Sequence, residues 1–361
     1  MKVLHLMVSG QAGGIESLLR DFVEYSRHEN LFLFAWDGGP AAERIAACGC
    51  RVILMDKEKE GARAVCGRIL ALCEEERVDV VIAHHEAPML RIVAMLAKIR
   101  NPKIKVLWYA HSNAFDLCDG RRKKGLALRK WIYRTTFYRA DGAIAISNSV
   151  KDSLVRYLGL PEERVTVIYN GVILKRFSQK RADGDSKTLR LIYVGRLIEE
   201  KGVQTILKAL SLLPEGNYRF TVVGDGAFRE SLQALAGKLG IAEKVEFLGT
   251  RTDVPELLAQ TDVFMHLPDW EEGFGIAVVE AMASGLICVC GDRGALPEIV
   301  EDGVSGFIVH NNDPERLAEI LGTIDPNSAE SGILRANAVK ASEKFSIEAF
   351  AAKLDDLIEE A

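Results

Sequence analysis

Short apolar runs alternate with amphipathic helical patterns along almost the whole chain. In these runs Val, Ile and Leu often follow one another without strict alternation, which is typical of strands buried on both faces of a parallel sheet. The runs span residues 2–8, 31–36, 51–55, 78–83, 104–110, 142–147, 165–169, 189–194, 219–223, 244–248, 262–267, 286–290 and 306–309. The helical patterns lie near residues 15–27, 62–76, 88–99, 122–139, 149–158, 202–212, 226–238, 253–260, 276–284 and 314–322. This alternation predicts an α/β protein.

The alternation is interrupted once, by the polar and aperiodic segment 175–188. We place the domain linker there, beginning just after Asn170-Gly171-Val172, so that residues 1–172 and 173–344 form two Rossmann-like domains. Two open parallel sheets whose carboxyl ends face each other would form a cleft between the domains, and such a cleft is a preferred ligand position.

The length, charge and cysteine content of the chain limit the classes of protein to which it can belong. A chain of 361 residues is long enough for two cores. Its net charge of -5 gives no reason to expect nucleic acid as a partner. No apolar run reaches the roughly 18–20 residues of a membrane span. The seven cysteines include no C-x-x-C pair, which favours buried, reduced thiols over disulfides or metal ligands and indicates a cytosolic protein.

The segment 270–285 carries two carboxylates eight positions apart, Glu272 in a glycine-rich turn and Glu280 in the helix that follows. A helix start offers free backbone N–H groups and a positive dipole end to an anion. Carboxylates accept hydrogen bonds from sugar hydroxyls. The segment therefore predicts a site for a nucleotide sugar.

A second turn, Gly195 to Gly202, places Arg196 and Lys201 between a strand and a helix. Two such cations can neutralise a diphosphate, Arg by forking onto two oxygens and Lys as a point charge. The alternative is a charged surface turn in which these cations balance Glu199 and Glu200.

Three further turns follow strands. They are Ser9 to Glu16, which contains Gly13-Gly14, the turn Gly224-Asp225-Gly226, and Thr250-Arg251-Thr252 after Phe247-Leu248-Gly249. Glycine lets the backbone approach a ligand closely, and Arg251 could lie beside a base. Ordinary structural turns explain the same residues. Ala12 breaks the G-x-G-x-x-G pattern, so a dinucleotide fingerprint is not supported.

His111 directly follows the run 104–110, at the carboxyl edge where open sheets bind ligands. Its imidazole could contact a sugar hydroxyl, although an isolated histidine is often structural. His84 and His85 follow an earlier strand and compete for this role.

The segment from Arg121 to Arg139 holds eight Lys/Arg and no Asp/Glu, with four aromatic residues among them. A basic aromatic helix of this kind can lie on an anionic membrane surface. The apolar positions do not form one clean face, so a solvated helix packed on its own domain is the alternative.

Signatures of a catalytic triad, a zinc site and a Walker loop are missing. The one D-x-D pattern, Asp183-Gly184-Asp185, falls in the polar linker. We therefore assign the cation role to Arg196 and Lys201 and expect no metal and no cofactor.

Together the motifs resemble the retaining glycosyltransferases of family four, which have the GT-B fold. The resemblance covers nearly the whole chain. It rests on Gly13-Gly14-Ile15-Glu16, His111, Ala145-Ile146-Ser147, Tyr169-Asn170-Gly171-Val172, Gly195-Arg196 with Lys201-Gly202, Gly224-Asp225-Gly226, Phe247-Leu248-Gly249, Glu272-Gly273-Phe274-Gly275, Glu280-Ala281-Met282-Ala283 and Gly294-Ala295-Leu296-Pro297-Glu298-Ile299-Val300.

The resemblance implies a role for each matched residue. Glu280 would bind the donor ribose, and Glu272 the transferred sugar. Arg196 and Lys201 would grip the diphosphate, and His111 would lie near the reactive face of the sugar. The other donor-binding residues would be Gly14, Gly224, Arg251, Phe274, Gly275 and Ile276.

The chain departs from the family pattern at two of these places. Ser112-Asn113 follows His111 where an aspartate is common, and Asp269 stands where the family often has serine. The resemblance also implies that residues 345–361 form a helix that returns to the first domain.

We therefore expect a metal-independent, retaining hexosyltransferase. It would move a hexose or N-acetylhexosamine from a nucleotide sugar, with UDP as the expected nucleotide, to a glycan or polyprenyl-diphosphate-linked acceptor of cell-surface polysaccharide synthesis. The first domain would bind the acceptor, at the inner face of the cell membrane. Two alternatives are a sugar-nucleotide epimerase of GT-B-like architecture and a nucleotide-sugar-binding protein without catalysis.

Overall fold

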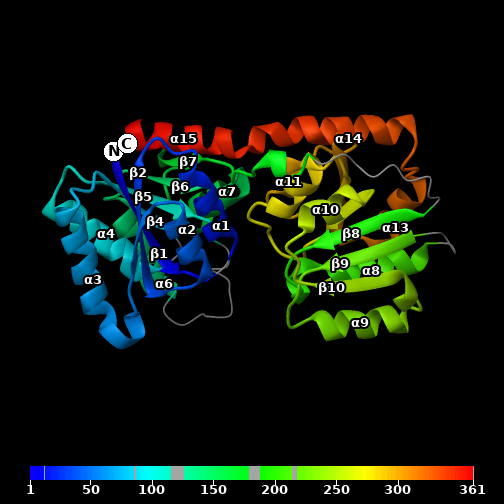
Figure 1. The fold of residues 1–361 in the computed structure, drawn as a ribbon, viewed down its shortest axis with the longest axis horizontal. Coiled ribbons are helices and arrows are strands. Elements are labelled where there is room, and N and C mark those ends of the chain that lie inside the picture. The colour runs from blue at the N-terminus through cyan, green and yellow to red at the C-terminus, as the bar shows by residue number, and fades with distance from the viewer. Residues whose placement is uncertain (12, 85–86, 115–125, 179–187, 214–217, 361) are drawn as a thin grey trace. The chain divides into compact units, whose positions relative to one another are not determined.

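The computed structural model describes residues 1–11, 13–84, 87–114, 126–178, 188–213 and 218–360 (Figure 1). The chain forms two compact units. The first comprises Met1–Gly171 and Ile347–Ala361, and the second comprises Val172–Ser346. The crossover into the second unit thus lies between Gly171 and Val172. The polar segment 179–187, with its D-x-D pattern, lies outside the described residues.

The first unit is built on a seven-stranded sheet of order β3-β2-β1-β4-β5-β6-β7, in which every pairing is parallel. Its strands are β1 (Lys2–Ser9), β2 (Glu29–Asp37), β3 (Arg51–Leu54), β4 (Val80–His84), β5 (Lys105–Ala110), β6 (Gly142–Ala145) and β7 (Val165–Val167). Its helices are α1 (Gly14–Val23), α2 (Pro40–Ala47), α3 (Lys57–Glu75), α4 (Pro88–Arg100), α6 (Leu126–Phe137), α7 (Asn148–Leu158) and α15 (Ile347–Glu360).

The second unit is built on a six-stranded parallel sheet of order β10-β9-β8-β11-β12-β13. Its strands are β8 (Leu189–Val194), β9 (Tyr218–Val223), β10 (Val245–Gly249), β11 (Val263–His266), β12 (Ile287–Gly291) and β13 (Gly306–Val309). Its helices are α8 (Val203–Leu212), α9 (Arg229–Lys238), α10 (Val254–Ala259), α11 (Ile276–Ala283), α12 (Leu296–Ile299), α13 (Pro314–Thr323) and α14 (Ala329–Ser342).

The sheet of the second unit separates two helical layers. Alternate strand residues such as Leu191, Tyr193 and Met265 form a core with α8, α9 and α13, which pack on one face. On the other, α11 packs against α14 (Figure 1). Because side chains alternate along a strand, His266 points to the face opposite Met265.

The prediction of two parallel α/β sheets is confirmed, and each predicted strand overlaps an observed one. Three helices were missed, α2, α12 and α14. The fully buried residues of α14 are the small Ser331, Ala338 and Ser342, whereas Leu334 is only partly buried and Ile333 and Val339 are exposed. A helix that buries small side chains leaves no apolar period to detect.

Two predictions about thiols and membrane spans can be compared with the described residues. Cys48, Cys50, Cys66, Cys73, Cys288 and Cys290 all carry free thiols. Within the described parts of the chain, no helix is both long and apolar enough to cross a bilayer.

The C-terminal helix α15 is fixed to the first unit by a buried carboxylate. Asp355, 1% exposed, accepts hydrogen bonds from the Ser26 hydroxyl at 3.0 Å and from the Arg27 amide at 2.7 Å. On the same helix, Phe350 packs edge-to-face on Phe22 of α1. The last residues of the chain therefore complete the core of its first unit.

Replacing Asp355 tests this docking. Asp355→Ala removes the buried carboxylate that accepts from the part-buried Ser26 hydroxyl and Arg27 amide, so we expect it to lower the free energy of unfolding of the first unit by about 2 kcal/mol. Asp356→Ala is the matched control, because Asp356 is exposed and its ion pair with Arg27 contributes less than about 1 kcal/mol. Urea denaturation and hydrogen exchange of the α1 amides measure both. Equal effects of the two variants would contradict the docking role.

Candidate functional site

Glycine-rich loops interlock at the carboxyl edge of the second sheet. The Gly195 amide donates to the Val223 carbonyl at 3.0 Å, and the Gly224 amide donates to the Gly249 carbonyl at 2.8 Å. A Cβ atom on Gly224 would lie 1.9 Å from the Gly195 carbonyl oxygen. Glycine at position 224 is thus required by the packing of one loop on the next, and this packing fixes the position of the turn that carries Arg196.

The helix α11 begins in the glycine-rich turn after Glu272, where the sequence predicts a nucleotide-sugar site. Gly275 caps it with φ 101°, a conformation that favours glycine. The Val278 and Val279 amides donate to the Gly275 carbonyl, whereas the amides of Ile276 and Ala277 precede the first possible acceptor of the helix. Phe274 is buried and packs edge-to-face on Phe345, which anchors the turn. Glu280 lies one turn into α11 and is half-buried.

Glu272 is the centre of a buried polar cluster. Its Oε2 atom lies 2.6 Å from Lys201 Nζ, 3.0 Å from His266 Nε2 and 3.5 Å from Trp270 Nε1. The ammonium of Lys201 also lies 5.0 Å from the centroid of the Trp270 ring. The Glu272 and Lys201 side chains are only 13% and 12% exposed, so solvent screens this ion pair weakly.

The cluster sets the protonation state of Glu272. Burial by itself would raise the pKa of this carboxyl, but the hydrogen bond and charge of His266 and the Lys201 ammonium hold the pKa well below its usual range. Glu272 is therefore ionised at neutral pH. All three of its side-chain contacts within the described structure use Oε2, which leaves Oε1 to accept hydrogen bonds from a ligand.

The loop that carries Glu272 is held from both sides. Asp269 accepts hydrogen bonds from Gln204 and Asn312, each at 2.9 Å. On the other side, a Cβ atom on Gly294 would lie 2.1 Å from the Glu272 carbonyl oxygen, so the backbones touch there. The aspartate that departs from the family pattern is thus a structural anchor of this loop.

The two predicted arginines differ in their surroundings. Arg196 is exposed, its carbonyl accepts the Tyr193 hydroxyl at 3.1 Å, and its guanidinium has no carboxylate partner among the described residues. Arg251 forms a two-pronged ion pair with Asp253, at 2.8 and 2.6 Å. Arg196 is therefore the better placed of the two for an incoming anion.

The first unit places its predicted residues at the carboxyl edge of its own sheet. Gly14 begins α1, after Gly13 as its cap. His111 directly follows β5, and its Nε2 lies 2.9 Å from Nδ1 of His84, the last residue of β4. The two histidines that compete for one role in the sequence are thus hydrogen-bonded partners. His85 lies outside the described residues.

Sequence reasoning missed two members of the Glu272 cluster, His266 and Trp270. His266 ends β11 just as His84 ends β4, so the strand-end position that drew attention to His111 could have found it. The contact of Trp270 with Lys201 depends on the course of the loop and left no signal in the sequence.

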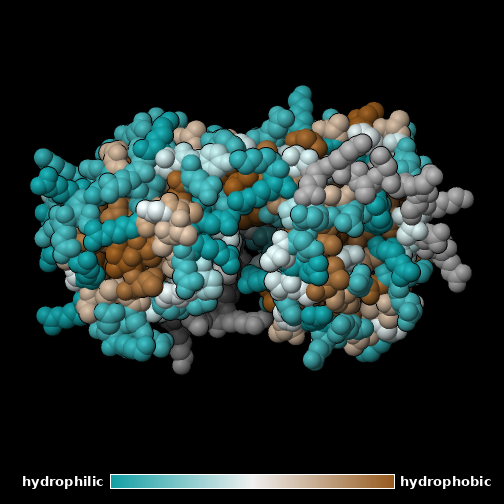
Figure 2. All heavy atoms as spheres, in the orientation of Figure 1, coloured by the Kyte–Doolittle hydropathy of each residue, from teal (hydrophilic) through white to brown (hydrophobic). Residues whose placement is uncertain are grey.

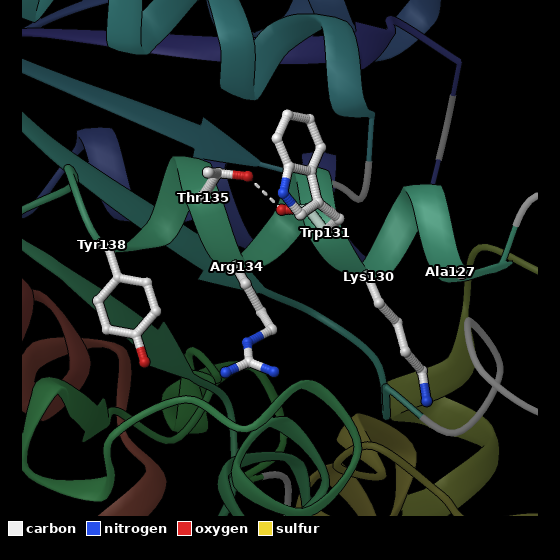
Figure 3. Close-up of a pocket in the computed structure, with 6 residues that line it drawn as sticks. All are labelled: Ala127, Lys130, Trp131, Arg134, Thr135 and Tyr138. Atoms are coloured by element: carbon white, nitrogen blue, oxygen red, sulfur yellow. Dashed lines mark hydrogen bonds between the residues drawn. The ribbon is translucent and has the colours of Figure 1, made fainter.

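The basic segment of the first unit is described from Leu126 onward, and its residues 121–125 lie outside the described parts. A cavity of about 400 Å³ lies along α6, lined by Ala127, Lys130, Trp131, Arg134, Thr135 and Tyr138. Figure 3 shows Lys130, Arg134 and Tyr138 extending from the same side of the helix. Tyr133 and Phe137 are buried, so α6 packs on its own unit and still exposes cations and aromatic rings.

No group of three or more His, Cys, Asp or Glu side chains is arranged to hold a metal ion in the part of the chain that the structure describes.

The ion pair of Glu272 predicts a pH-dependent stability. Because the pKa of Glu272 is depressed in the folded state, its ionised form stabilises the fold above about pH 4.3, the ordinary pKa of glutamate. This stabilisation is lost as the pH falls toward the lower pKa of the folded state. The difference in unfolding free energy between the wild type and Glu272→Gln should therefore shrink between about pH 5 and pH 3. Urea denaturation across this range measures the difference, and parallel curves would contradict the ion pair.

Comparison with known families covers nearly the whole chain. Residues 9–176 match the model of glycosyltransferase family 4, and residues 175–345 match that of the glycosyl transferases group 1. Together the two models span both units.

Curated relatives agree with this assignment. The putative colanic acid biosynthesis glycosyltransferase WcaL of Escherichia coli K12 is 30% identical over 72% of this chain and 63% of its own length. The amylovoran biosynthesis glycosyltransferase AmsK of Erwinia amylovora is 28% identical over 66% and 60%. The chain thus spans less than two thirds of these two relatives. The UDP-Gal:alpha-D-GlcNAc-diphosphoundecaprenol alpha-1,3-galactosyltransferase of E. coli is 26% identical over 75% and 72%.

Solved structures show the same fold. Anabaena HepE, determined in complex with UDP, superposes with a TM-score of 0.86 over the full length of both chains at 23% identity. WaaG, a glycosyltransferase involved in lipopolysaccharide biosynthesis, superposes with a TM-score of 0.71 over 99% of both chains at 20% identity. The chain has the GT-B fold and belongs to family four of the glycosyltransferases.

Proposed function

We propose that this protein is a retaining, metal-independent glycosyltransferase. It would move a hexose or N-acetylhexosamine from a UDP sugar to a glycan or lipid-linked acceptor. The observation that carries the proposal is the Glu272 cluster, where an ionised carboxylate and the ammonium of Lys201 meet beside the start of α11. Sugar hydroxyls need acceptors and a diphosphate needs cations, and this edge of the sheet supplies both.

The second unit would bind the donor. Glu280 accepts hydrogen bonds from the ribose hydroxyls, and Glu272 accepts them from the transferred sugar through Oε1. Arg196 and Lys201 bind the diphosphate together with the amides of Phe274, Gly275 and Ile276 at the helix start. The family resemblance supports these roles, and HepE, which has the same fold, was solved in complex with UDP-glucose.

Cations and amides held in place by the fold would stabilise the charge that develops during sugar transfer. Departure of UDP places negative charge on the β-phosphate and positive charge on the anomeric carbon. Cations and amides that are already in place stabilise the phosphate without reorganising. The leaving phosphate then accepts the proton of the acceptor hydroxyl, and the new bond forms on the face that UDP left, so that the configuration is retained. A glycosyl-enzyme adduct trapped by mass spectrometry would rule out this front-face route.

The acceptor is inferred from the relatives and from the surface of the first unit. The E. coli galactosyltransferase named above uses an undecaprenyl-diphosphate-linked sugar. On the first unit, Figure 2 shows apolar side chains gathered in the region of α4 and α6, which pack together. The exposed apolar residues of these helices are Ile92, Leu96, Ile99, Leu128 and Trp131. Together with the basic residues Lys130 and Arg134 of α6, they favour a lipid-linked acceptor at an anionic membrane, as in cell-surface polysaccharide synthesis.

Release of UDP from a panel of UDP sugars, with and without lipid-diphosphate acceptors, tests the activity. We expect acceptor-dependent release that persists in EDTA, with the anomeric configuration retained in the product. Conversion of the donor without an acceptor would indicate an epimerase, and affinity for UDP without release would indicate a binding protein.

Variants separate the roles of the two glutamates. Glu280→Ala removes a ribose contact and should weaken UDP affinity on the order of tenfold, measured by calorimetry. Glu272→Gln keeps the shape but loses the charge beside the transferred sugar, so it should lower kcat on the order of a hundredfold and leave UDP affinity within a few-fold. Unchanged kinetics in both variants would contradict the assigned site.

Membrane binding is tested with vesicles. Lys130→Glu/Arg134→Glu reverses the charges of half-buried Lys130 and exposed Arg134 on α6 and should weaken binding to phosphatidylglycerol vesicles at least about tenfold, since each basic residue contributes about 1 kcal/mol. Lys238→Glu/Lys340→Glu, which reverses two exposed charges of the second unit, is the matched control. Co-sedimentation at low and high salt measures both. Absence of wild-type binding at low salt would contradict the membrane proposal.

A further inference from the structure

The segment that leads from β11 to Glu272 is tied to the end of β13 by the buried side chain of Asn312. The amide nitrogen of this side chain lies 3.3 Å from the Leu267 carbonyl oxygen and 2.7 Å from the Pro268 carbonyl oxygen. It also lies 2.9 Å from Oδ1 of Asp269. Since all three oxygens are acceptors, the nitrogen of the amide, rather than its oxygen, must face them. Asn312 is 7% exposed, so it holds three successive residues away from solvent.

The backbone at Asn312 has a conformation that favours glycine. Its φ is 49°, and the φ of the preceding residue, Asn311, is 55°. This left-handed region is least costly for glycine, and asparagine is among the few other residues that are enriched there. Asn311 is exposed, whereas Asn312 is buried and forms the bonds described above. Asparagine at position 312 thus combines a left-handed turn with a buried hydrogen-bond donor.

The end of β12 leaves room for this side chain. A Cβ atom on Gly291 would overlap Oδ1 of Asn312, and it would lie 3.4 Å from Cα of Leu267. Any other residue at position 291 would therefore push Asn312 away from the segment that it binds. The ends of β11, β12 and β13 are thus packed around the Asn312 amide.

Asp269 is also joined to the loop that carries Lys201. Its backbone amide donates to the Glu200 carbonyl at 2.9 Å. Its Oδ2 atom accepts from Nε2 of Gln204 at 2.9 Å, and the same nitrogen lies 3.0 Å from the Glu199 carbonyl oxygen. Asp269 is therefore a junction at which the loops that follow β8, β11 and β13 meet.

The junction controls the spacing of the buried ion pair. Lys201 directly follows Glu200, which is bonded to Asp269, and Glu272 lies three positions after Asp269. Lys201 Nζ and Glu272 Oε2 are 2.6 Å apart. A functional constellation has to be held within about 0.5 Å of its productive geometry, by neighbours that are themselves locked by packing and hydrogen bonds. Asn312 and its bonds to the 267–269 segment meet this requirement.

We propose that Asn312 is a positioning residue of the donor site. Through Asp269 it fixes the spacing of Lys201 and Glu272, and thereby the alignment of the diphosphate with the transferred sugar. This role rests on the proposed function, because the two side chains meet a nucleotide sugar only in that reaction. A side chain that served stability alone would form the same bonds without affecting turnover.

Three variants separate the side chain from the backbone and from its shape. Asn312→Gly removes the buried amide and eases the left-handed backbone. Asn311→Gly eases the backbone in the same way at an exposed position, so it is the matched control. Asn312→Asp keeps the shape but replaces the donating nitrogen by an oxygen, which would face two carbonyl oxygens and the Asp269 carboxylate.

We expect kcat with a UDP sugar to fall on the order of tenfold in Asn312→Gly and at least as far in Asn312→Asp, because the reacting groups lose their alignment. In Asn311→Gly, kcat should stay within about twofold of the wild type. UDP affinity, measured by calorimetry, should stay within a few-fold in all three variants, because Arg196 is unchanged.

Carboxylate NMR follows Glu272 without any substrate. Its ¹³C resonance is assigned by its loss in Glu272→Gln. Against the effect of burial, His266 and Lys201 hold the pKa of Glu272 below its ordinary value of about 4.3, so the wild-type resonance should not titrate between about pH 6 and pH 4. A looser ion pair in Asn312→Gly raises this pKa, and the resonance should then begin to titrate in that range. In Asn311→Gly it should behave as in the wild type.

Gln204→Ala is the second test if the Asn312 variants do not fold. It removes the tie to Asp269 from the other side and leaves Asn312 in place. Because the bond from the Asp269 amide to the Glu200 carbonyl remains, kcat and the titration of Glu272 should change in the same direction but less than in Asn312→Gly.

The outcomes are distinguishable. Equal kcat in Asn312→Gly and Asn311→Gly with an unchanged titration of Glu272 would overturn the positioning role. A lower melting temperature in Asn312→Gly with kcat intact would overturn it as well. Failure of the proposed function would show itself as a wild type that releases no UDP from any UDP sugar, while Asn312→Gly still changes the titration of Glu272.

Discussion

A parallel sheet brings the carboxyl ends of all its strands to one edge, and the chemistry of this chain depends on that constraint. In the second unit, the loop after β8 supplies Lys201, the end of β11 supplies His266, and the turn before α11 supplies Glu272. These residues are up to 71 positions apart in the chain and meet within 3.0 Å. The loops can approach so closely because glycines at their contact points remove the side chains that would separate them.

Each unit buries polar side chains near the carboxyl edge of its own sheet, and the two units provide hydrogen-bond partners for these side chains in different ways. The Glu272 cluster contains a charge, which is matched by an ammonium and an imidazole because an unpaired buried carboxylate would be costly. In the first unit, His5, His84 and His111 are joined by hydrogen bonds of 2.9 Å, and burial lowers the pKa of His5 to about 4, so this ring is neutral at physiological pH. The first arrangement keeps a carboxylate ionised, and the second keeps a buried imidazole uncharged.

Much of the fold could be read from the sequence because buried parallel strands leave continuous apolar runs. The same reading found Glu272 and Lys201, since glycine-rich strand ends are local signals. It did not find α14, whose fully buried residues are all small. It also missed the link from His5 to His111, because that link depends on the order β1-β4-β5 in the sheet. In the sequence His5 is only a polar residue within an apolar strand, and strand order is set by long-range packing rather than by local pattern.

The Glu272 cluster also determines which cation is available to a diphosphate. The Lys201 ammonium has three donors, of which Glu272 occupies one, so it can bridge this carboxylate and a phosphate oxygen. Its charge, however, is already largely balanced by Glu272. The guanidinium of Arg196 has no carboxylate partner in the described structure, so its charge is not balanced in this way. In the proposed donor site, Arg196 would therefore supply most of the net attraction for the diphosphate, while Lys201 would fix the position of the phosphate relative to the carboxylate that is proposed to hold the sugar. Attraction and alignment would then depend on two different cations of one loop.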